Sequence, residues 1–387
     1  MMFVNNNNHS KRLQMKTRAT ELLGIDLPIF AFSHCRDVVA AVSQAGGMGV
    51  LGVANFTAEQ LEQELNWIDT HVGDKTYGVD LLIPNTYQAV GQQKLDLDKL
   101  LPASQRAFVS RICDEAGLPK LPAGEAEELM AEEFRHINMT PEEGNALIEI
   151  ALRHPKVTLV VNALGTPPKE KVAELQARGI KVGSLIGKPE HARAQIEAGV
   201  DLLVAQGMEA GGHTGQITSM VLWPQVVDLA GDIPVLAAGG IGRGRQMAAA
   251  LALGADGIWC GSIWLGTAQS ELDPLIKQRM FDARSEDAVQ TRAITGKPCR
   301  ALKSEFTEAW LKPDAPATLP MPLQSLVGTE ARLRAKRGGV SSWLSWPVGQ
   351  IVGDMKHETS VREVVQSLLE EFLDATDRLQ QLVDSAN

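Results

Sequence analysis

One histidine stands in a glycine-rich stretch, A-Q-G-M-E-A-G-G-H-T-G, over residues 205–215. An imidazole titrates near neutral pH, so it can accept or release a proton under physiological conditions. The small residues beside His213, Gly211 and Gly212 among them, let a flat ligand come close to the backbone. A loop histidine that only caps the next helix is the alternative reading. We interpret His213 as a catalytic residue beside a bound ligand.

Three glycine-rich turns indicate a phosphate site. A-A-G-G-I-G-R-G at 237–244 ends an apolar segment and opens a helical pattern, so its backbone N–H groups can converge on a phosphate. C-G-S-I-W at 260–264 adds the Gly261 N–H and the Ser262 hydroxyl, and 211–212 offers a third close approach. A single glycine turn is weak evidence, because such turns often need glycine for a positive φ alone. Three turns after consecutive strands favour phosphate binding.

Other candidate residues follow predicted strands. Asp80 and Asn162 lie near the ends of the third and fourth strands, where they could meet a ring system attached to the phosphate. Small residues dominate these ends, which favours a flavin mononucleotide over a sugar phosphate. His34, in A-F-S-H-C-R-D, lies just beyond the first strand. A substrate contact and a turn or helix-capping role remain equally open for it.

Eight short apolar segments alternate with helical patterns, which predicts a parallel sheet covered by helices. The segments are 27–32, 48–52, 77–84, 157–165, 180–187, 201–207, 233–240 and 257–265. No G-x-G-x-x-G follows the first segment, as a doubly wound dinucleotide-binding sheet would require. The glycine turns instead follow the sixth, seventh and eighth segments, near where a (β/α)8 TIM barrel binds phosphate. We therefore predict an α/β protein with a TIM barrel.

The pattern divides the chain into several parts. We predict a disordered tail at 1–14 and a barrel over 15–275. A helical insertion at 85–142, after the third strand, is either a lid over the barrel mouth or an outer decoration. A helical extension at 276–387 should pack on the barrel, and 360–382 has the spacing of an amphipathic helix.

Composition excludes several classes of protein. The chain has 387 residues, 44% of them hydrophobic, and a net charge of −10, which argues against nucleic-acid binding. It contains no apolar run long enough for membrane insertion. Its four cysteines form no C-x-x-C pair and match no zinc spacing, so we expect no metal site and reduced thiols in a cytoplasmic enzyme. A homodimer is compatible with the sequence.

Three segments resemble the nitronate monooxygenase family, formerly called 2-nitropropane dioxygenases. They are the loop at 205–215, the segment 233–265 and P-V-G-Q-I-V-G at 347–353. The related flavin-dependent enoyl-(acyl carrier protein) reductases share these motifs. E-A-G-G-H followed by A-x-G-G is the most specific part. The resemblance covers 20–84 and 155–370 and implies a TIM barrel with one non-covalent FMN.

Carried over position by position, the resemblance implies that His213 is the catalytic histidine. It also implies FMN contacts at residues from four parts of the chain: Ala31, Phe32, Ser33, Gln206, Gly211, Gly212, Ala238, Gly239, Gly240, Gly261 and Ser262. This sequence departs from the family at the F-S-H-C-R-D ending of the first strand and in the larger insertion. It also has Leu185 where some nitronate-oxidising members carry a basic residue. These departures lie near where the substrate would bind, so they affect the prediction of the substrate more than that of the cofactor.

Three functions for a small-molecule enzyme or binder follow from the resemblance. The first is oxidation of alkyl nitronates, with FMN passing electrons to O₂ and His213 acting as a base or hydrogen-bond donor. The second is reduction of an enoyl thioester or a quinone, with NAD(P)H as co-substrate. The third is a flavin-binding protein without catalysis, and a titratable group beside the ring argues against it.

Overall fold

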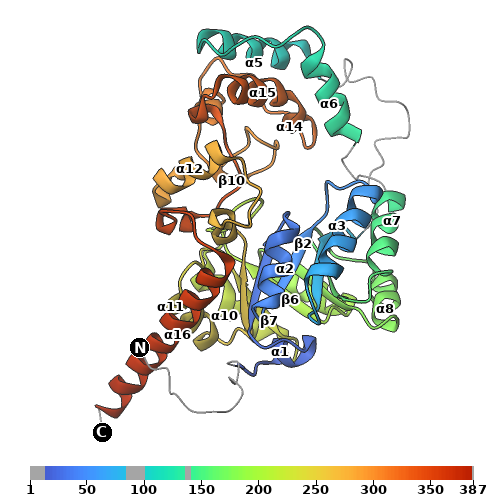
Figure 1. Cartoon of the computed structure of the whole chain (residues 1–387), viewed down its shortest axis with the longest axis vertical. Helices are drawn as coiled ribbons and strands as arrows, with labels where there is room; N and C mark the ends of the chain where they lie inside the picture. Colours follow the sequence, from blue (N-terminus) through green and yellow to red (C-terminus); the bar gives the residue numbers. More distant parts are fainter. Residues whose placement is uncertain (1–13, 84–100, 136–140, 386–387) are drawn as a thin grey trace.

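The computed structural model describes residues 14–83, 101–135 and 141–385. Eight parallel strands close into a barrel in chain order, with the first hydrogen-bonded to the eighth (Figure 1). The strands are β1 Ile29–Ser33, β2 Met48–Gly52, β3 Tyr77–Leu81, β4 Val157–Asn162, β5 Lys181–Ile186, β6 Leu202–Gln206, β7 Val235–Ala238 and β8 Gly257–Cys260. The predicted TIM barrel is confirmed. Residues 1–13 of the predicted tail at 1–14 lie outside the described residues.

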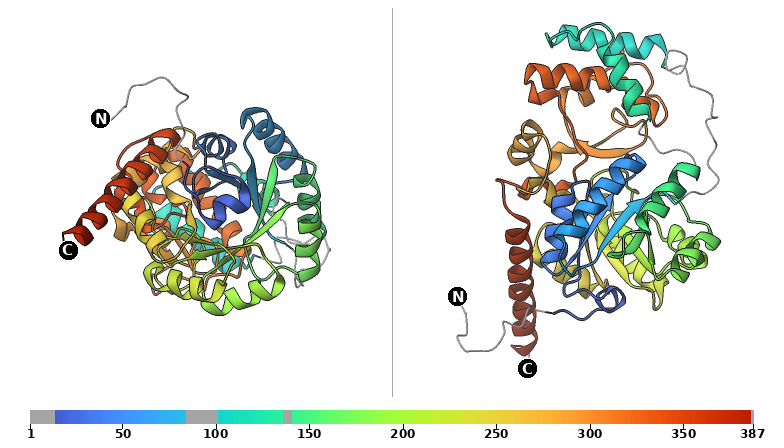
Figure 2. Two further views of the ribbon diagram at one scale, coloured as in Figure 1. Left: turned by 90° about the horizontal axis from the view of Figure 1, so that it is seen from below. Right: turned by 45° about the vertical axis from the view of Figure 1, so that its right-hand side comes forward.

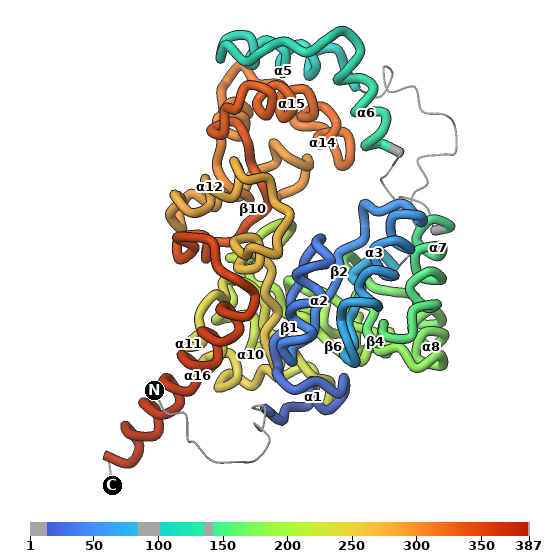
Figure 3. Tube along the Cα trace, viewed as in Figure 1, coloured from blue at the N-terminus to red at the C-terminus, as the bar shows by residue number. Residues whose placement is uncertain are grey.

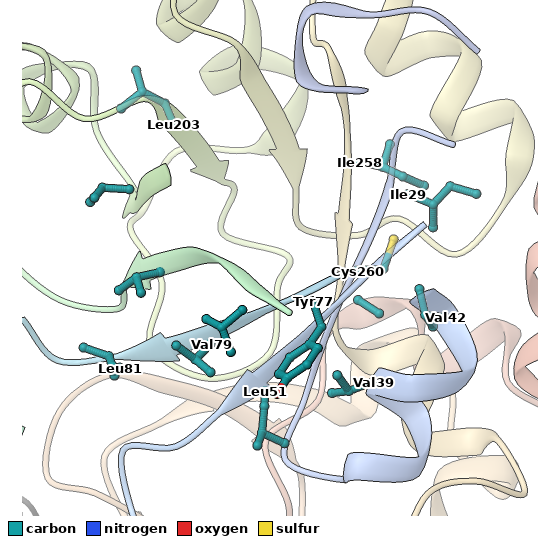
Figure 4. Packing of buried hydrophobic residues seen from close by; sticks show 14 of the residues in the cluster. Ile29, Val39, Val42, Leu51, Tyr77, Val79, Leu81, Leu203, Ile258 and Cys260 are labelled. Carbon is teal, nitrogen blue, oxygen red and sulfur yellow. The ribbon is translucent and has the colours of Figure 1, made fainter. Parts of the chain in front are cut away.

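Helices cover the outside of the barrel. Between strands they are α2 Arg36–Gln44, α3 Ala58–His71, α7 Pro141–Ala151, α8 Lys169–Ala177, α9 Pro189–Ala198, α10 Ser219–Ala230 and α11 Gly244–Ala252, while α1 Arg18–Leu23 precedes β1. Thr57 and Gln60 form the capping box that starts α3. Apolar side chains fill the layer between strands and helices, as where Leu51 and Tyr77 lie beside Val39 of α2 (Figure 4).

A second set of residues fills the barrel interior. Alternate strand positions, including Phe30, Val50, Leu159 and Trp259, point inward and pack together. Because side chains alternate across a strand, their neighbours face the helices instead. The interior is therefore packed below the level at which the strands end, and any ligand must bind above it.

The predicted eighth strand, 257–265, is too long. β8 ends at Cys260, and Ser262–Gly266 forms a 3-10 helix, η1. The Trp264 indole bonds back to the Cys260 carbonyl, and its backbone N–H bonds to the Gly261 carbonyl, so the chain turns instead of extending.

The extension contains a hairpin that the sequence did not predict. Its strands, β9 Ala288–Thr291 and β10 Cys299–Leu302, pair in antiparallel fashion. The helices around it are α12 Pro274–Asp282, η2 Ser285–Asp287, α13 Glu305–Ala309, α14 Leu323–Val327, α15 Thr329–Gly338, η3 Ser341–Trp343, η4 Gln350–Asp354 and α16 Val361–Asp384. Each hairpin strand is only four residues long, too short for a clear alternating pattern.

The described helices of the insertion, α5 Ala103–Glu115 and α6 Glu125–Arg135, pack against α14 and α15 of the extension (Figure 3). Phe108 and Ile112 share a core with Trp310 there, and the Arg334 guanidinium bonds to Asp114. These helices stand on the side of the barrel where the strands end, but they touch the extension. No described residue of the insertion lines the cavity found there. Residues 85–100, which include the polar start of the insertion, lie outside the described part of the chain.

The last helix, α16, packs the end of the extension against the outer helices of the barrel (Figure 2). It packs along α11 and touches α2, and Arg243 bonds to Glu371 across the contact. A Cβ placed on Gly244 would lie 2.0 Å from the Leu368 carbonyl oxygen and 2.5 Å from the Phe372 nitrogen. Among the described helices, none combines the length and apolarity that crossing a membrane requires.

We predict that Gly244→Ala destabilises the protein. Replacing glycine by alanine in a helix normally gains about 1 kcal/mol. Here the methyl group would meet backbone atoms of α16, which cannot rotate away, and overpacking of this kind costs about 1–3 kcal/mol or more. Chemical unfolding followed by circular dichroism measures the difference. Gly242→Ala is the matched control, because its Cβ would meet only the Ile351 side chain at 3.4 Å or more. Equal stability of the two variants would contradict the packing described.

Candidate active site

A cavity of about 420 Å³ opens where the barrel strands end. Thirteen of the predicted site residues line it: Phe32, Ser33, His34, Asp80, Gln206, Gly211, Gly212, His213, Ala238, Gly239, Gly240, Gly261 and Ser262. Ala31 and Asn162 do not line it, and the side chain of Ala31 packs in the outer core between strands and helices. The sequence therefore located the cavity from several distant segments.

The glycine turns have the geometry of a phosphate cradle. Gly239 and Gly240 have φ angles of 102° and 70°, a region that side chains disfavour. A Cβ on Gly261 would meet nothing closer than 3.9 Å, so its backbone borders open space. The Ser262 Oγ accepts a bond from the Gly349 N–H at 2.8 Å, which leaves the hydroxyl hydrogen free to donate. This donor set fits the phosphate of a flavin nucleotide.

The imidazole of His213 forms part of the cavity wall. Its Nδ1 lies 2.9 Å from the carbonyl oxygen of Pro298. A carbonyl can only accept, so Nδ1 carries the hydrogen and Nε2 of the neutral ring is the acceptor. The second nitrogen is thus available to take a proton from a ligand.

The hairpin of the extension holds the loop that carries His213. Gly212 and Arg300 exchange two backbone hydrogen bonds, at 2.9 and 2.7 Å. The Arg300 guanidinium also donates to the carbonyl oxygens of Met208 and Ala288. Arg300 is 5% exposed, and burial lowers the pKa of its guanidinium. One buried side chain therefore ties the loop to β9.

Glu209, within the E-A-G-G-H motif, supports the loop from the other side. Its carboxylate accepts bonds from the N–H and the hydroxyl of Ser219, at the start of α10. Its backbone carbonyl accepts from the Gln350 N–H. A Cβ on Gly349 would lie 2.6 Å from that carbonyl, so the P-V-G-Q-I-V-G segment needs glycine to pack here. Glu209 therefore positions the loop.

His34 is not a helix cap. Helix α2 begins after Cys35, and no side chain caps it. The His34 Nδ1 lies 2.8 Å from the Gly52 carbonyl oxygen, and its ring meets Phe32 edge to face. His34 lines the cavity, and desolvation by the surrounding protein lowers the pKa of its imidazolium. His34 is therefore a neutral wall residue with Nε2 as its acceptor.

Asp80 and Asn162, which the sequence treated alike, differ in the structure. Asn162 accepts a bond from the Ile83 N–H and donates to the carbonyls of Leu164 and Gly165, so it shapes a loop and does not line the cavity. Asp80 lines the cavity, is 4% exposed, and its Oδ2 has no partner. Burial raises the pKa of Asp80 well above its ordinary value.

The sequence missed most wall residues that come from the extension. Thr295 and Cys299 belong to the hairpin, and Trp346, Pro347 and Ile351 to the segment before α16. The P-V-G-Q-I-V-G motif was a signal for the last two, but nothing local marked the hairpin. Burial raises the pKa of the cavity thiols Cys260 and Cys299 to about 12 and about 11, so both stay protonated near neutral pH.

The closed barrel and the cavity at the ends of its strands, lined by glycine turns and by His213, agree with a flavin-dependent oxidoreductase, the class to which its relatives assign the chain. Residues 114–371 match the family described as nitronate monooxygenase. The chain belongs to this family.

Individual relatives agree with the family. The Mycobacterium tuberculosis protein named "Putative monooxygenase Rv1533" is 44% identical over 95% of this chain and 100% of its own length. The nitroalkane oxidase of Streptomyces ansochromogenes superposes with a TM-score of 0.74, at 27% identity over 94% of this chain and 100% of that one. FabK of Thermotoga maritima, an enoyl-(acyl carrier protein) reductase, gives 0.70 at 26% identity over 95% and 100%.

We predict that Arg300→Met retains bound flavin but lowers turnover per flavin by about tenfold or more. Losing hydrogen bonds from a charged group costs about 1.5–3 kcal/mol, and the loop carrying His213 would lose its anchor. Turnover and thermal unfolding should be measured together, with Arg300→Lys expected to recover part of the loss.

Arg279→Met is the matched control. Arg279 also donates to two backbone carbonyls, those of Leu344 and Lys303, and burial also lowers the pKa of its guanidinium. It does not contact the loop at 205–215. If both variants lose stability equally and neither loses turnover, Arg300 does not position His213.

Proposed function

We propose that this protein is an FMN-dependent enzyme that oxidises alkyl nitronates with O₂. The geometry of His213, which lines the cavity and has its Nδ1 bonded to the Pro298 carbonyl, carries the proposal. When bound, the flavin would accept electrons from the substrate and pass them to O₂. Release of FMN on acid precipitation would support the cofactor assignment, and release of FAD would contradict it.

Different residues would bind the cofactor and transfer the proton. The N–H groups of Gly240 and Gly261 and the Ser262 hydroxyl would hold the phosphate, while Gln206 and the backbone of Ala31 to Ser33 would meet the rest of the cofactor. His213 Nε2 would take the proton from the carbon bearing the nitro group of a neutral nitroalkane. The electron pair of that C–H bond then moves onto the nitro group, giving the nitronate. The Pro298 carbonyl would stabilise the resulting imidazolium through Nδ1–H.

A second candidate is NAD(P)H-dependent reduction of an enoyl thioester or a quinone. The likeness to FabK favours it, as does Leu185 in the cavity wall where some nitronate-oxidising relatives carry a basic residue. In that reaction His213 would deliver a proton or polarise the thioester carbonyl, and His34 would contact the substrate in either case.

The four free cysteines support a cytoplasmic location.

We also propose that the enzyme is a homodimer joined through α16. Apolar residues follow a strict 3-4 spacing along this helix: Val361, Val365, Leu368, Phe372, Ala375, Leu379 and Leu382. The first of them are buried on the barrel, but Leu379 and Leu382 are 54% and 58% exposed where the helix runs past the barrel (Figure 2). A second copy offers the same stripe and could cover both through knobs-into-holes packing.

We predict that replacing Leu379 and Leu382 together by lysine changes the protein from dimer to monomer in light scattering. Leu373→Lys, at an exposed position off the stripe, should leave the dimer intact. Flavin content and turnover should stay unchanged, because α16 lines no part of the cavity. A monomeric wild type, or a dimer in both variants, would contradict the assignment.

His213→Ala should retain FMN and lose about 10²- to 10⁴-fold of turnover with a neutral nitroalkane, the usual contribution of positioned proton transfer. The loss should be smaller with a preformed nitronate, which arrives already deprotonated. Turnover per bound FMN is the measurement, with a nitroalkane, its nitronate, and an enoyl thioester with NAD(P)H as substrates.

His191→Ala is the control for that variant, because His191 lies exposed on α9 and outside the cavity. It should match wild type in every assay. If His213→Ala turns over the wild-type substrate with a loss below threefold, His213 is not catalytic.

A further inference from the structure

The carboxyl group of Asp80 lies at the inner end of the cavity without any partner for one of its oxygens. Asp80 is on β3, opposite Gly52 of β2 and Val161 of β4. Its side chain is 4% exposed, it lines the cavity, and Oδ2 is buried without a hydrogen bond. Buried polar atoms are almost always paired, so an unpaired one that faces a cavity indicates a ligand.

The surroundings of Asp80 disfavour a negative charge. Phe32, Leu185 and Trp259 line the same part of the barrel interior and are apolar. Gly52 offers no side chain, and no ion pair involves Asp80 within the part of the chain that the structure describes. The other titratable groups of the cavity wall are two histidines, His34 and His213, and two thiols, Cys260 and Cys299.

The ionisation of Asp80 follows from this setting. Burial is the sole cause of its raised pKa, because no cation lies close enough to offset the desolvation of a carboxylate. A neutral carboxylic acid has an O–H to donate as well as oxygens that accept. A carboxylate in the same place could only accept.

We propose that Asp80 binds the ring of the flavin as a neutral carboxylic acid, with its O–H donated to an acceptor atom of the ring. This inference rests on the proposed cofactor. It goes beyond that cofactor because it makes flavin affinity depend on the protonation of Asp80. An asparagine could supply a comparable N–H donor without a titrating group, which gives a matched replacement of nearly the same size.

Proton linkage gives the expected direction of the pH effect. Donating to the flavin stabilises the protonated form, so the pKa of Asp80 is higher with flavin bound than without it. Flavin affinity is then constant below the pKa of the free protein. Above that pKa the dissociation constant rises by up to about tenfold per pH unit, until the pKa of the complex is reached.

The test uses the full chain stripped of flavin and titrated with FMN between pH 7 and 9, where the phosphate stays doubly charged. Quenching of flavin fluorescence gives the dissociation constant for wild type, Asp80→Asn and Asp80→Ala. Above the pKa of Asp80 in the free protein we expect wild type to bind more weakly as pH rises. Asp80→Asn should bind equally at every pH, and Asp80→Ala should bind about tenfold more weakly than wild type at pH 7. Circular dichroism checks that each variant is folded.

Infrared difference spectra of wild type with and without FMN give a second readout that needs no activity. The carbonyl stretch of a protonated acid should shift on FMN binding at pH 7 and should be absent in Asp80→Asn. Carboxylate bands at pH 7 in their place, or the same decrease of affinity with rising pH in wild type and Asp80→Asn, would overturn the inference without contradicting the proposed cofactor. Failure of wild type to bind FMN would instead overturn the proposed function.

Discussion

The active site depends on one contact between segments far apart in the sequence, the pairing of Gly212 with Arg300. Gly212 has a φ of 80°, so the loop turns there in a way that suits glycine, and His213 follows at once. The residues before Arg300 bring the Pro298 carbonyl to the imidazole. The barrel supplies the histidine, but the extension selects which nitrogen of its ring holds the hydrogen.

The rest of the extension keeps that contact in place. The Arg300 guanidinium crosses from β10 to the loop and to β9, and the P-V-G-Q-I-V-G segment packs between Glu209 and Ser262. Helix α16 returns to the barrel and closes against α11. Helices α5 and α6 of the insertion share a core with α14 and α15. Helices α5 and α6 thus stabilise the part of the extension that carries the hairpin, and neither of them lines the cavity.

Sequence patterns predicted the elements that repeat and missed those that rely on distant partners. Near-continuous apolar strands and glycine turns follow from local rules, so the barrel and the lining residues at the ends of its strands could be predicted. The turn after Cys260 and the hairpin around Pro298 depend on contacts with other segments, which local spacing does not record. Likewise, Ala31 and Phe32 are neighbours in sequence, but strand alternation turns only Phe32 toward the cavity.

If the cavity oxidises nitronates through a bound flavin, a nitronate must be able to reduce that flavin. Purified protein with its flavin is mixed without oxygen, in one experiment with an alkyl nitronate and in another with NADH or NADPH, while the flavin absorbance is followed in time. We expect the nitronate to bleach the flavin absorbance rapidly, and we expect the absorbance to recover when O₂ is admitted. Fast bleaching by NADH or NADPH with none by the nitronate would contradict it and identify a reductase.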